Sequence, residues 1–189
     1  DPMLFGFYVA KGFEESDINM PARQTEMSAG YDLECAEDVV IPPMLAMQQE
    51  IVEIDEQDLE DLAANGEEYV PVVVQQIFLA DNRPTLVKTG LKCRVPEGMV
   101  LKLFPRSSLA YKKNLTVANN VGIIDADYFE NESNDGHIMV AVLNRGTKPV
   151  EIKKGERIAQ AILEQFYVFP REETPVAARV GGFGSTEDK

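Results

Sequence analysis

The feature that most constrains this fold is a series of short apolar, β-prone runs separated by prolines and glycines. Leu4–Val9, Ile138–Asn144 and Glu156–Phe169 are examples. Proline cannot donate to a strand ladder, and glycine favours turns, so both residues divide the chain into short strands. Only one stretch has convincing helical signals. At 189 residues the chain is long enough for one domain with a substantial core. The pattern predicts an all-β or β-rich fold.

The one helix is expected shortly after residue 55. Asp55 can cap its first turn, and Ile54 and Leu59 stand at the spacing of a hydrophobic staple across that cap. Leu59, Leu62 and Ala63 then form an apolar stripe, and Gly66 can end the helix. A strand-like run follows at Tyr69–Leu79, with a turn at Asn82–Pro84. The segment from about residue 50 to 84 is therefore expected to be ordered, as a helix plus a strand or hairpin. We expect either a structural elaboration on the sheet edge or a surface for a partner.

Val117–Tyr128 combines turn residues with acidic residues. Two apolar runs flank Asn119-Asn120 and Gly122, and these residues accept the left-handed backbone of a hairpin or tight bend. Asp125, Asp127 and Tyr128 follow the second run directly. Acidic residues after a strand are usually turn formers, but a carboxylate and a phenol delivered together also suit a site. The stretch alone leaves both interpretations open.

Composition excludes several functional classes. The net charge of −14 argues against a general nucleic-acid binder, which needs a basic face for phosphate. Glu50–Glu68 holds nine acidic residues and no Lys or Arg. The sequence has no apolar run of transmembrane length. Cys35 and Cys93 lack metal-site spacing, and without a secretory signal we expect both to be reduced and buried in a cytoplasmic protein. Asp1-Pro2 is set aside as vector-derived.

Five short motifs occur in the same order as in the trimeric dUTPases, and the sequence resembles that family except over roughly residues 50–84. The motifs are AGYDL at Ala29–Leu33, PRSS at Pro105–Ser108, GIIDADY at Gly122–Tyr128, GERIAQ at Gly155–Gln160, and GGFGST at Gly181–Thr186. The resemblance implies a distorted, jelly-roll-like β-barrel over residues 3–175, interrupted by the insertion. A flexible C-terminal arm over residues 176–189 would carry the glycine-rich motif. It also implies a homotrimer in which three chains complete each site.

The resemblance further implies hydrolysis of dUTP to dUMP and pyrophosphate, which keeps uracil out of DNA and supplies dUMP for thymidylate synthesis. Water would attack the α-phosphorus, with Asp125 as the general base. Mg²⁺ would be held by the substrate phosphates and water, with no direct protein ligand, because Mg²⁺ tends to keep its waters.

Each motif carries expected site residues. The phosphate residues are Arg106, Ser107, Ser108, Gln160, Arg179, Gly184, Ser185 and Thr186. The uracil and deoxyribose residues are Asn119, Gly122, Ile123, Ile124, Tyr128, Met139 and Phe183. Asp32 is expected to support the phosphate and metal-water network.

Simpler interpretations remain open for several of these residues. Asp32 can be a carboxylate that caps a neighbouring amide at a turn or strand end. Ser107 or Ser108 can be the N-cap of a short helix over LAYKKN. Gln160 and Arg157 can be polar residues on the solvent face of a strand. The family resemblance favours a structural ion pair for Arg157.

Two departures from the family pattern concern the site. Glu130 stands where the family usually has Gly, and Asn131–Gly136 lengthens the loop that follows. Arg179 stands two residues before Gly-Gly rather than the commoner three, which leaves its contact open. His137 has no Ser, Cys or metal-ligand partner beside it, so we expect a surface loop residue.

Three other functions remain. A dCTP deaminase, or a bifunctional dCTP deaminase/dUTPase, shares the Arg-Ser-Ser stretch. A nucleotide-gated regulatory protein would use residues 50–84 as its partner surface. A jelly-roll binding module without activity is the third.

Overall fold

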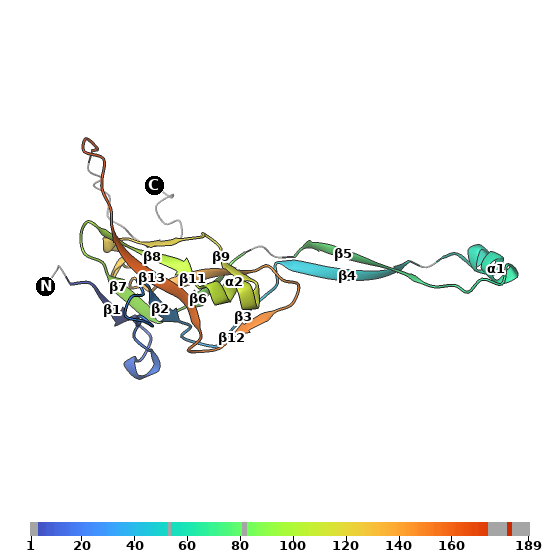
Figure 1. Ribbon diagram of the computed structural model, residues 1–189, viewed down its shortest axis with the longest axis horizontal. Helices are drawn as coiled ribbons and strands as arrows, with labels where there is room; N and C mark the ends of the chain where they lie inside the picture. Colours follow the sequence, from blue (N-terminus) through green and yellow to red (C-terminus); the bar gives the residue numbers. More distant parts are fainter. Residues whose placement is uncertain (1–3, 53, 81–82, 174–180, 183–189) are drawn as a thin grey trace.

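The computed structural model describes residues 4–52, 54–80, 83–173 and 181–182, and it consists of a β-rich body with one long arm (Figure 1). The strands are β1 Gly6–Val9, β2 Tyr31–Glu34, β3 Val39–Ile41, β4 Leu45–Val52, β5 Val72–Leu79, β6 Thr85–Lys88, β7 Leu91–Arg94, β8 Met99–Pro105, β9 Leu115–Val117, β10 Gly122–Ile124, β11 Met139–Asn144, β12 Val150–Ile152 and β13 Arg157–Gln165. The helices are α1 Glu56–Ala64 and α2 Ser107–Lys113, with 3-10 turns η1 Glu15–Asp17 and η2 Ala126–Tyr128. The expectation of a β-rich fold with a helix-containing insertion is confirmed.

The body is built from small antiparallel sheets. A four-stranded sheet has the order β10-β8-β13-β2, and a three-stranded sheet has the order β6-β11-β9. Two-stranded pairs, β1-β7 and β12-β3, complete the body. In the four-stranded sheet, Gly122, Leu103, Ala161 and Tyr31 lie opposite one another in a single row. This row provides a reference for the distances between site residues on different strands.

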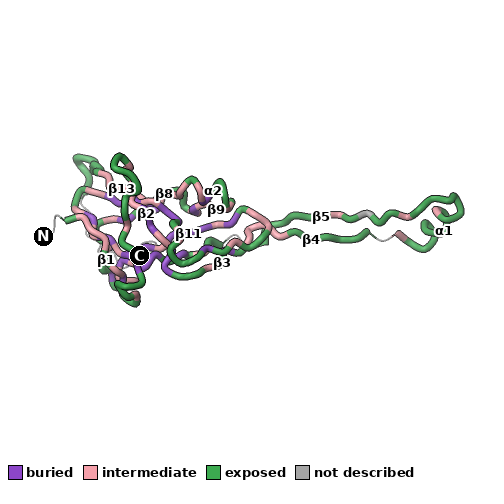
Figure 2. The backbone as a smooth tube through the Cα atoms, turned by 60° about the horizontal axis from the view of Figure 1, so that its bottom comes forward, coloured by how far each residue is buried: buried purple, intermediate pink, exposed green. Residues whose placement is uncertain are grey.

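The core lies entirely in the body (Figure 2). Leu33, Leu101, Val142 and Ile158 are fully buried, and they come from β2, β8, β11 and β13. Cys35 and Cys93 are both buried and unpaired by disulfide, as expected. Burial raises the pKa of the Cys93 thiol to about 12, so this thiol is inert at neutral pH.

The insertion forms an arm that projects away from the body (Figures 1 and 2). Strands β4 and β5 pair along their full length, from Leu45 opposite Leu79 to Val52 opposite Val72, and α1 lies at the tip. The arm begins at Leu45, earlier than the expected boundary near residue 50. The arm follows directly on Pro42-Pro43: the Met44 N–H bonds the Asn144 carbonyl at 2.8 Å, and strand pairing resumes at Leu45.

The end signals of α1 operate as predicted. The Asp55 side chain accepts a hydrogen bond from the Asp58 N–H at 2.9 Å. At the other end Gly66 has a φ of +71°, which costs glycine little. The Glu67 N–H bonds the Leu62 carbonyl and the Gly66 N–H bonds the Ala63 carbonyl, which is a Schellman motif. No residue of α1 is buried.

The Val117–Tyr128 stretch is a tight bend between two sheets. Strand β9 pairs with β11 and strand β10 pairs with β8, so the interpretation of this stretch as a paired hairpin is wrong. Asn120 has a φ of +59°, the left-handed backbone that the turn residues indicated. Because each flanking run finds a longer partner in its own sheet, the bend opens between the two sheets instead of closing into a ladder.

Candidate active site

An apolar pocket of about 250 Å³ opens beside this bend. Six of the seven residues expected to contact uracil or deoxyribose line it. They are Asn119, Gly122, Ile123, Ile124, Tyr128 and Met139, joined by Leu103, Val121 and Gly182. The pocket is mostly aliphatic with backbone polar groups at the bend, which suits a flat heterocycle whose edge can form hydrogen bonds.

Close packing beneath the pocket explains Gly122. A Cβ at this position would lie 3.1 Å from the Cβ of Leu103 on the neighbouring strand β8. Glycine therefore lets β10 lie directly against β8. Any larger residue would push the pocket wall outward.

Tyr128 forms the pocket wall from η2. Its side chain is 5% exposed, and its hydroxyl donates to the His137 carbonyl at 3.0 Å. Gly182 lies against the ring, since a Cβ there would be 2.9 Å from Tyr128 Cε2. The glycine-rich segment thus reaches the pocket through Gly182, a residue that the sequence argument did not select.

Asp125 lies between β10 and η2, directly after Ile124, which lines the pocket. It is half-buried and occupies the N-cap position of η2, and its carbonyl accepts from the Tyr128 N–H at 3.1 Å. The short turn ties the positions of the carboxylate and the phenol ring together.

A second, polar pocket of about 200 Å³ gathers residues from the other motifs. Its lining is Gln24, Ser28, Gly30, Asp32, Arg106, Ser107 and Gln160. Three expected phosphate residues converge here, together with Asp32. Gln24, Ser28 and Gly30 were not selected from the sequence; only Gly30 stood in a quoted motif.

Asp32 forms ion pairs with Arg106, which lines the polar pocket, and with Arg157, which lines the neighbouring cavity. Its carboxylate is 3.0 Å from Arg106 Nε and 3.3 Å from Arg157 Nη1, and its side chain is 9% exposed. The ion pair expected for Arg157 is confirmed. Asp32 is a residue of β2 that fixes Arg106, so the alternative of a simple capping carboxylate is wrong.

Gly30 and Gln160 fit together in this pocket. A Cβ on Gly30 would lie 2.8 Å from Gln160 Oε1, and Gln160 Nε2 donates to the Pro105 carbonyl at 3.3 Å. Glycine at position 30 leaves room for the amide side chain to remain at the pocket.

The two serines begin α2. Arg106 is the N-cap residue and no side chain caps the helix, so the interpretation of Ser107 or Ser108 as the N-cap is wrong. Ser107 faces the polar pocket, whereas Ser108 lines a neighbouring cavity of about 350 Å³ with Arg106, Lys112, Lys113 and Arg157. The cations gathered here give an acidic chain a local site for phosphate.

The two pockets lie far apart within one chain. Gly122 and Tyr31 stand three strands apart in one row, which at about 4.8 Å per strand is roughly 14 Å. Ile124 on β10 pairs with Leu101 on β8, so the next residue, Asp125, lies level with Val100. Arg106 is six residues beyond Val100 along the chain, a distance of about 20 Å. Asp125 and Arg106 of one chain therefore cannot contact the same phosphorus atom.

The departure at Glu130 has a local explanation. Glu130 has a φ of +56°, so its position needs the left-handed backbone that glycine adopts freely. For another residue this costs roughly 1–3 kcal/mol. Glu130 Oε1 accepts from Lys92 Nζ at 3.1 Å, and Lys92 also pairs with Asp135. Burial lowers the pKa of Lys92, but the hydrogen bonds and charges of Asp135 and Glu130 outweigh it and raise that pKa.

His137 is half-buried, so its interpretation as a surface loop residue is wrong. Its Nε2 accepts from the Gly90 N–H at 3.0 Å, and its ring packs edge-on against Phe13. Burial, with Lys88 nearby, lowers the pKa of the imidazole. The Asn131–Gly136 loop folds the histidine inward against the turn at Gly90, a contact that sequence spacing does not reveal.

Some expected features cannot be located. Arg179, Phe183, Gly184, Ser185 and Thr186 lie outside the described residues. Within the described ranges, no group of three or more His, Cys, Asp or Glu side chains could hold a metal ion. No described helix is long and apolar enough to cross a membrane.

Comparisons with known proteins agree with the motifs. The sequence profile of the dUTPase family matches residues 72–187. The deoxyuridine 5'-triphosphate nucleotidohydrolase of Lactococcus lactis is 35% identical over 182 residues, 96% of each chain. The crystal structure of the Streptococcus mutans dUTPase has a TM-score of 0.64 at 30% identity, over 87% of this chain and 98% of that one.

A phage protein shares the fold at lower identity. The dUTPase of Staphylococcus bacteriophage 80alpha has a TM-score of 0.58 at 19% identity, over 93% of this chain and 98% of that chain. At this identity the likeness shows the fold alone. Together, the family profile and the Lactococcus relative establish that this chain belongs to the dUTPase family.

Proposed function

We propose that this chain hydrolyses dUTP to dUMP and pyrophosphate. One observation carries the proposal: six residues expected to contact the nucleoside line a single pocket, and Asp125 follows directly after one of them, Ile124. The names of the family relatives support the same reaction. The product dUMP is a precursor for thymidylate, and removal of dUTP keeps uracil out of DNA. We place this role in the cytoplasm.

Uracil would enter edge-first at the bend. The backbone N–H and C=O groups near Asn119–Ile124 can match uracil's acceptor–donor–acceptor edge, whereas cytosine reverses two of those three groups. Each unmatched buried group costs about 1–3 kcal/mol. As the family resemblance implies, the tight bend would leave no room for a thymine methyl, and the Tyr128 ring would leave none for a 2′-hydroxyl. Phe183 would cover the base when the C-terminal arm closes.

Asp125 would act as the general base. A carboxylate beside the bound nucleotide can orient a water and accept its proton as the water oxygen attacks the α-phosphorus and the bond to the pyrophosphate oxygen breaks. Such a base contributes roughly 10²- to 10⁴-fold. The rest of the catalysis is positioning and charge neutralisation.

The polar pocket would hold the phosphate chain. Arg106, fixed by Asp32, would donate to phosphate oxygens with Ser107 and Gln160, and Ser108 would act from the adjacent cavity. Arg179, Gly184, Ser185 and Thr186 would close over the phosphates. Asp32 is already neutralised by two arginines, so the pocket suits a Mg²⁺ ion carried in by the triphosphate and its waters. The ion would supply charge neutralisation.

The active unit would be a homotrimer with each site shared between chains. Asp125 and Arg106 lie about 20 Å apart along β8 in one chain, which exceeds the reach of one triphosphate. A second copy must bring its polar pocket to the apolar pocket of the first. Mixing inactive Asp125→Asn and Arg106→Ala chains and reassembling them should therefore restore activity at least tenfold over either parent. Unchanged activity in mixed trimers confirmed by mass spectrometry would contradict shared sites.

Substrate identity is tested by pyrophosphate release. Each deoxynucleoside triphosphate is incubated in turn with Mg²⁺, and only dUTP should be turned over rapidly. Ammonia release from dCTP would instead indicate the deaminase or bifunctional activity. Binding of dUTP without release of pyrophosphate would support a binding module.

A second candidate function rests on the arm. Residues alternate between the two faces of a β-ribbon, which puts Leu45, Met47, Ile51, Val73, Ile77 and Leu79 on one face, on either side of the Gln49–Gln75 pair. Ile51, Ile77 and Leu79 are each at least 60% exposed. An isolated two-stranded ribbon is marginal in water, and exposed apolar patches mark interaction sites. The arm also carries nine of the fourteen net negative charges. We propose that it binds a cationic protein through this apolar face.

The partner is tested by capture followed by reconstitution. A protein captured from host extract must bind the purified enzyme, and its affinity should fall steeply with salt. Charging the apolar face with Met47→Asp and Ile77→Asp should abolish binding, whereas Gln48→Asp and Gln76→Asp on the opposite face should not. Equal loss from both pairs, or oligomerisation through the arm in place of capture, would contradict the proposal.

A further inference from the structure

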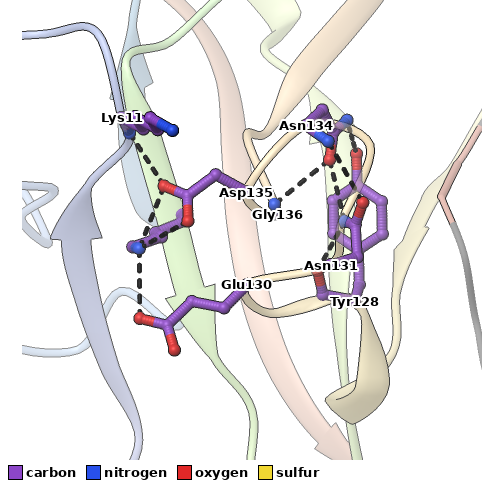
Figure 3. Close-up of polar contacts among 8 residues, drawn as sticks. Lys11, Tyr128, Glu130, Asn131, Asn134, Asp135 and Gly136 are labelled. Atoms are coloured by element: carbon purple, nitrogen blue, oxygen red, sulfur yellow. Dashed lines mark hydrogen bonds and ion pairs between the residues drawn. The ribbon is translucent and has the colours of Figure 1, made fainter.

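The Asn131–Gly136 loop, which departs from the family pattern, makes direct contact with the pocket wall. Asn134 Nδ2 donates to the hydroxyl of Tyr128 at 2.8 Å (Figure 3). The same hydroxyl donates to the His137 carbonyl. The phenol hydroxyl is therefore held by the loop residue Asn134 and by His137, which follows the loop, so the ring cannot swing without breaking a partly buried hydrogen bond.

A local hydrogen-bond network holds Asn134 in place. Its Oδ1 accepts from Asn131 Nδ2 at 2.8 Å and from the Gly136 N–H at 3.1 Å. Asn131 Nδ2 also donates to the Tyr128 carbonyl, which anchors the start of the loop to the tyrosine itself. A Cβ at Gly136 would lie 2.7 Å from that carbonyl oxygen, so the loop closes tightly over Tyr128.

Ion pairs attach the loop to the body. Lys92, on β7, is 13% exposed and contacts Glu130 and both carboxylate oxygens of Asp135 at 3.0–3.1 Å. Asp135 also accepts from the Lys11 N–H at 2.8 Å (Figure 3). The support behind Asn134 is thus connected to the rigid sheet and does not end in solvent.

We propose that Asn134 is a positioning residue that sets the enzyme's selection of deoxyribose over ribose. This inference rests on the proposed function, in which the Tyr128 ring occupies the space that a 2′-hydroxyl would need. To exclude the single oxygen atom of a 2′-hydroxyl, the Tyr128 ring must stay fixed in position. The Asn134 amide fixes the ring through its hydrogen bond to the phenol hydroxyl and does not itself touch substrate.

The test compares substrate ratios in the full-length enzyme. Asn134→Ala should reduce the preference for dUTP over UTP, measured as the ratio of kcat/KM values, by about tenfold. The preference for dUTP over dTTP should stay within twofold, since methyl exclusion belongs to the bend. Glu132→Ala, an exposed change in the same loop, is the matched control and should alter neither ratio.

A double-mutant cycle identifies the path of the effect. Tyr128→Phe removes the hydroxyl, so adding Asn134→Ala to it should have less than a twofold further effect on the ratio of dUTP to UTP. If the two changes multiply independently, Asn134 does not act through Tyr128. Asn134→Ser, whose shorter side chain does not reach the hydroxyl, replaces the alanine variant if that variant does not fold.

The outcomes separate this inference from the proposed function. Wild-type enzyme without dUTP hydrolysis would overturn the function. Wild-type enzyme that hydrolyses dUTP selectively, beside an Asn134 variant with the same dUTP preference, would overturn only the role of Asn134. A fall in thermal midpoint with an unchanged substrate ratio gives that second result, because it marks a purely structural role.

Discussion

The body and the arm follow opposite physical rules. The body buries its apolar residues in one core, from Leu33 on β2 to Ile158 on β13. The arm, from Leu45 to Leu79, leaves Ile51 and Ile77 exposed, and no residue of α1 is buried. Both regions contain regular secondary structure, so hydrogen-bonded strands alone do not indicate a core. The difference shows that the body folds by burial, whereas the arm is held by local pairing and caps.

The comparison predicts that catalysis depends on the body. Replacing Asp125 with Asn keeps the shape of the side chain and removes its charge, so turnover should fall by roughly 10²- to 10⁴-fold while nucleotide binding survives. Single-turnover kinetics and calorimetric titration with an uncleavable dUTP analogue measure the two quantities. Asp127→Asn, two residues away, is the control. A loss of turnover smaller than tenfold would remove Asp125 as the base.

Stability should depend on the body in the same way. Leu101→Ala, at a residue with 0% exposure, should lower the free energy of unfolding by about 2–5 kcal/mol. Leu79→Ala, the same change at 63% exposure on the arm, should cost less than about 0.5 kcal/mol. Urea unfolding of the two variants gives the comparison. A large cost at Leu79 would show that the arm packs against another surface in the assembled enzyme.

The half-buried His137 should make the body acid-sensitive near the pocket. The pKa of His137 is lowered in the folded state, so the unfolded state binds the proton more readily. Its contribution is therefore fully present above the ordinary value of 6.5 and is lost as pH falls below it. The thermal midpoint should decline over this window, and less so in His137→Gln, whose neutral side chain can still accept from the Gly90 N–H. Parallel declines in both proteins would assign the effect to other groups.

Removing the arm should have the smallest effect on catalysis. The Ala80 N–H already bonds the Met44 carbonyl at 3.0 Å, so an Asn-Gly turn can join these two residues in place of Leu45–Leu79. The kcat/KM for dUTP should stay within about threefold, because neither pocket is lined by arm residues. Steady-state kinetics on the trimeric deletion protein measures it. Complete loss of activity in a folded trimer would show that the arm shapes the site.

The sequence by itself determined the local features of this protein. The ends of α1 follow from Asp55 and Gly66, because a cap bonds amides only a few residues away. The alternation of short runs with Pro and Gly predicted a β-rich fold. The apolar pocket was predictable too, since most of its residues lie within one bend of the chain, between Asn119 and Tyr128.

Only the tertiary structure decided what depends on register and long-range packing. It separates Asp125 from Arg106 by about 20 Å, because the register of β10 on β8 places them at opposite ends of that strand. It turns His137 inward and sets Glu130 against Lys92, 38 residues earlier. It also connects Asn134 to the Tyr128 hydroxyl. These contacts depend on the register between strands that are distant in sequence, and residue spacing along the chain does not predict that register.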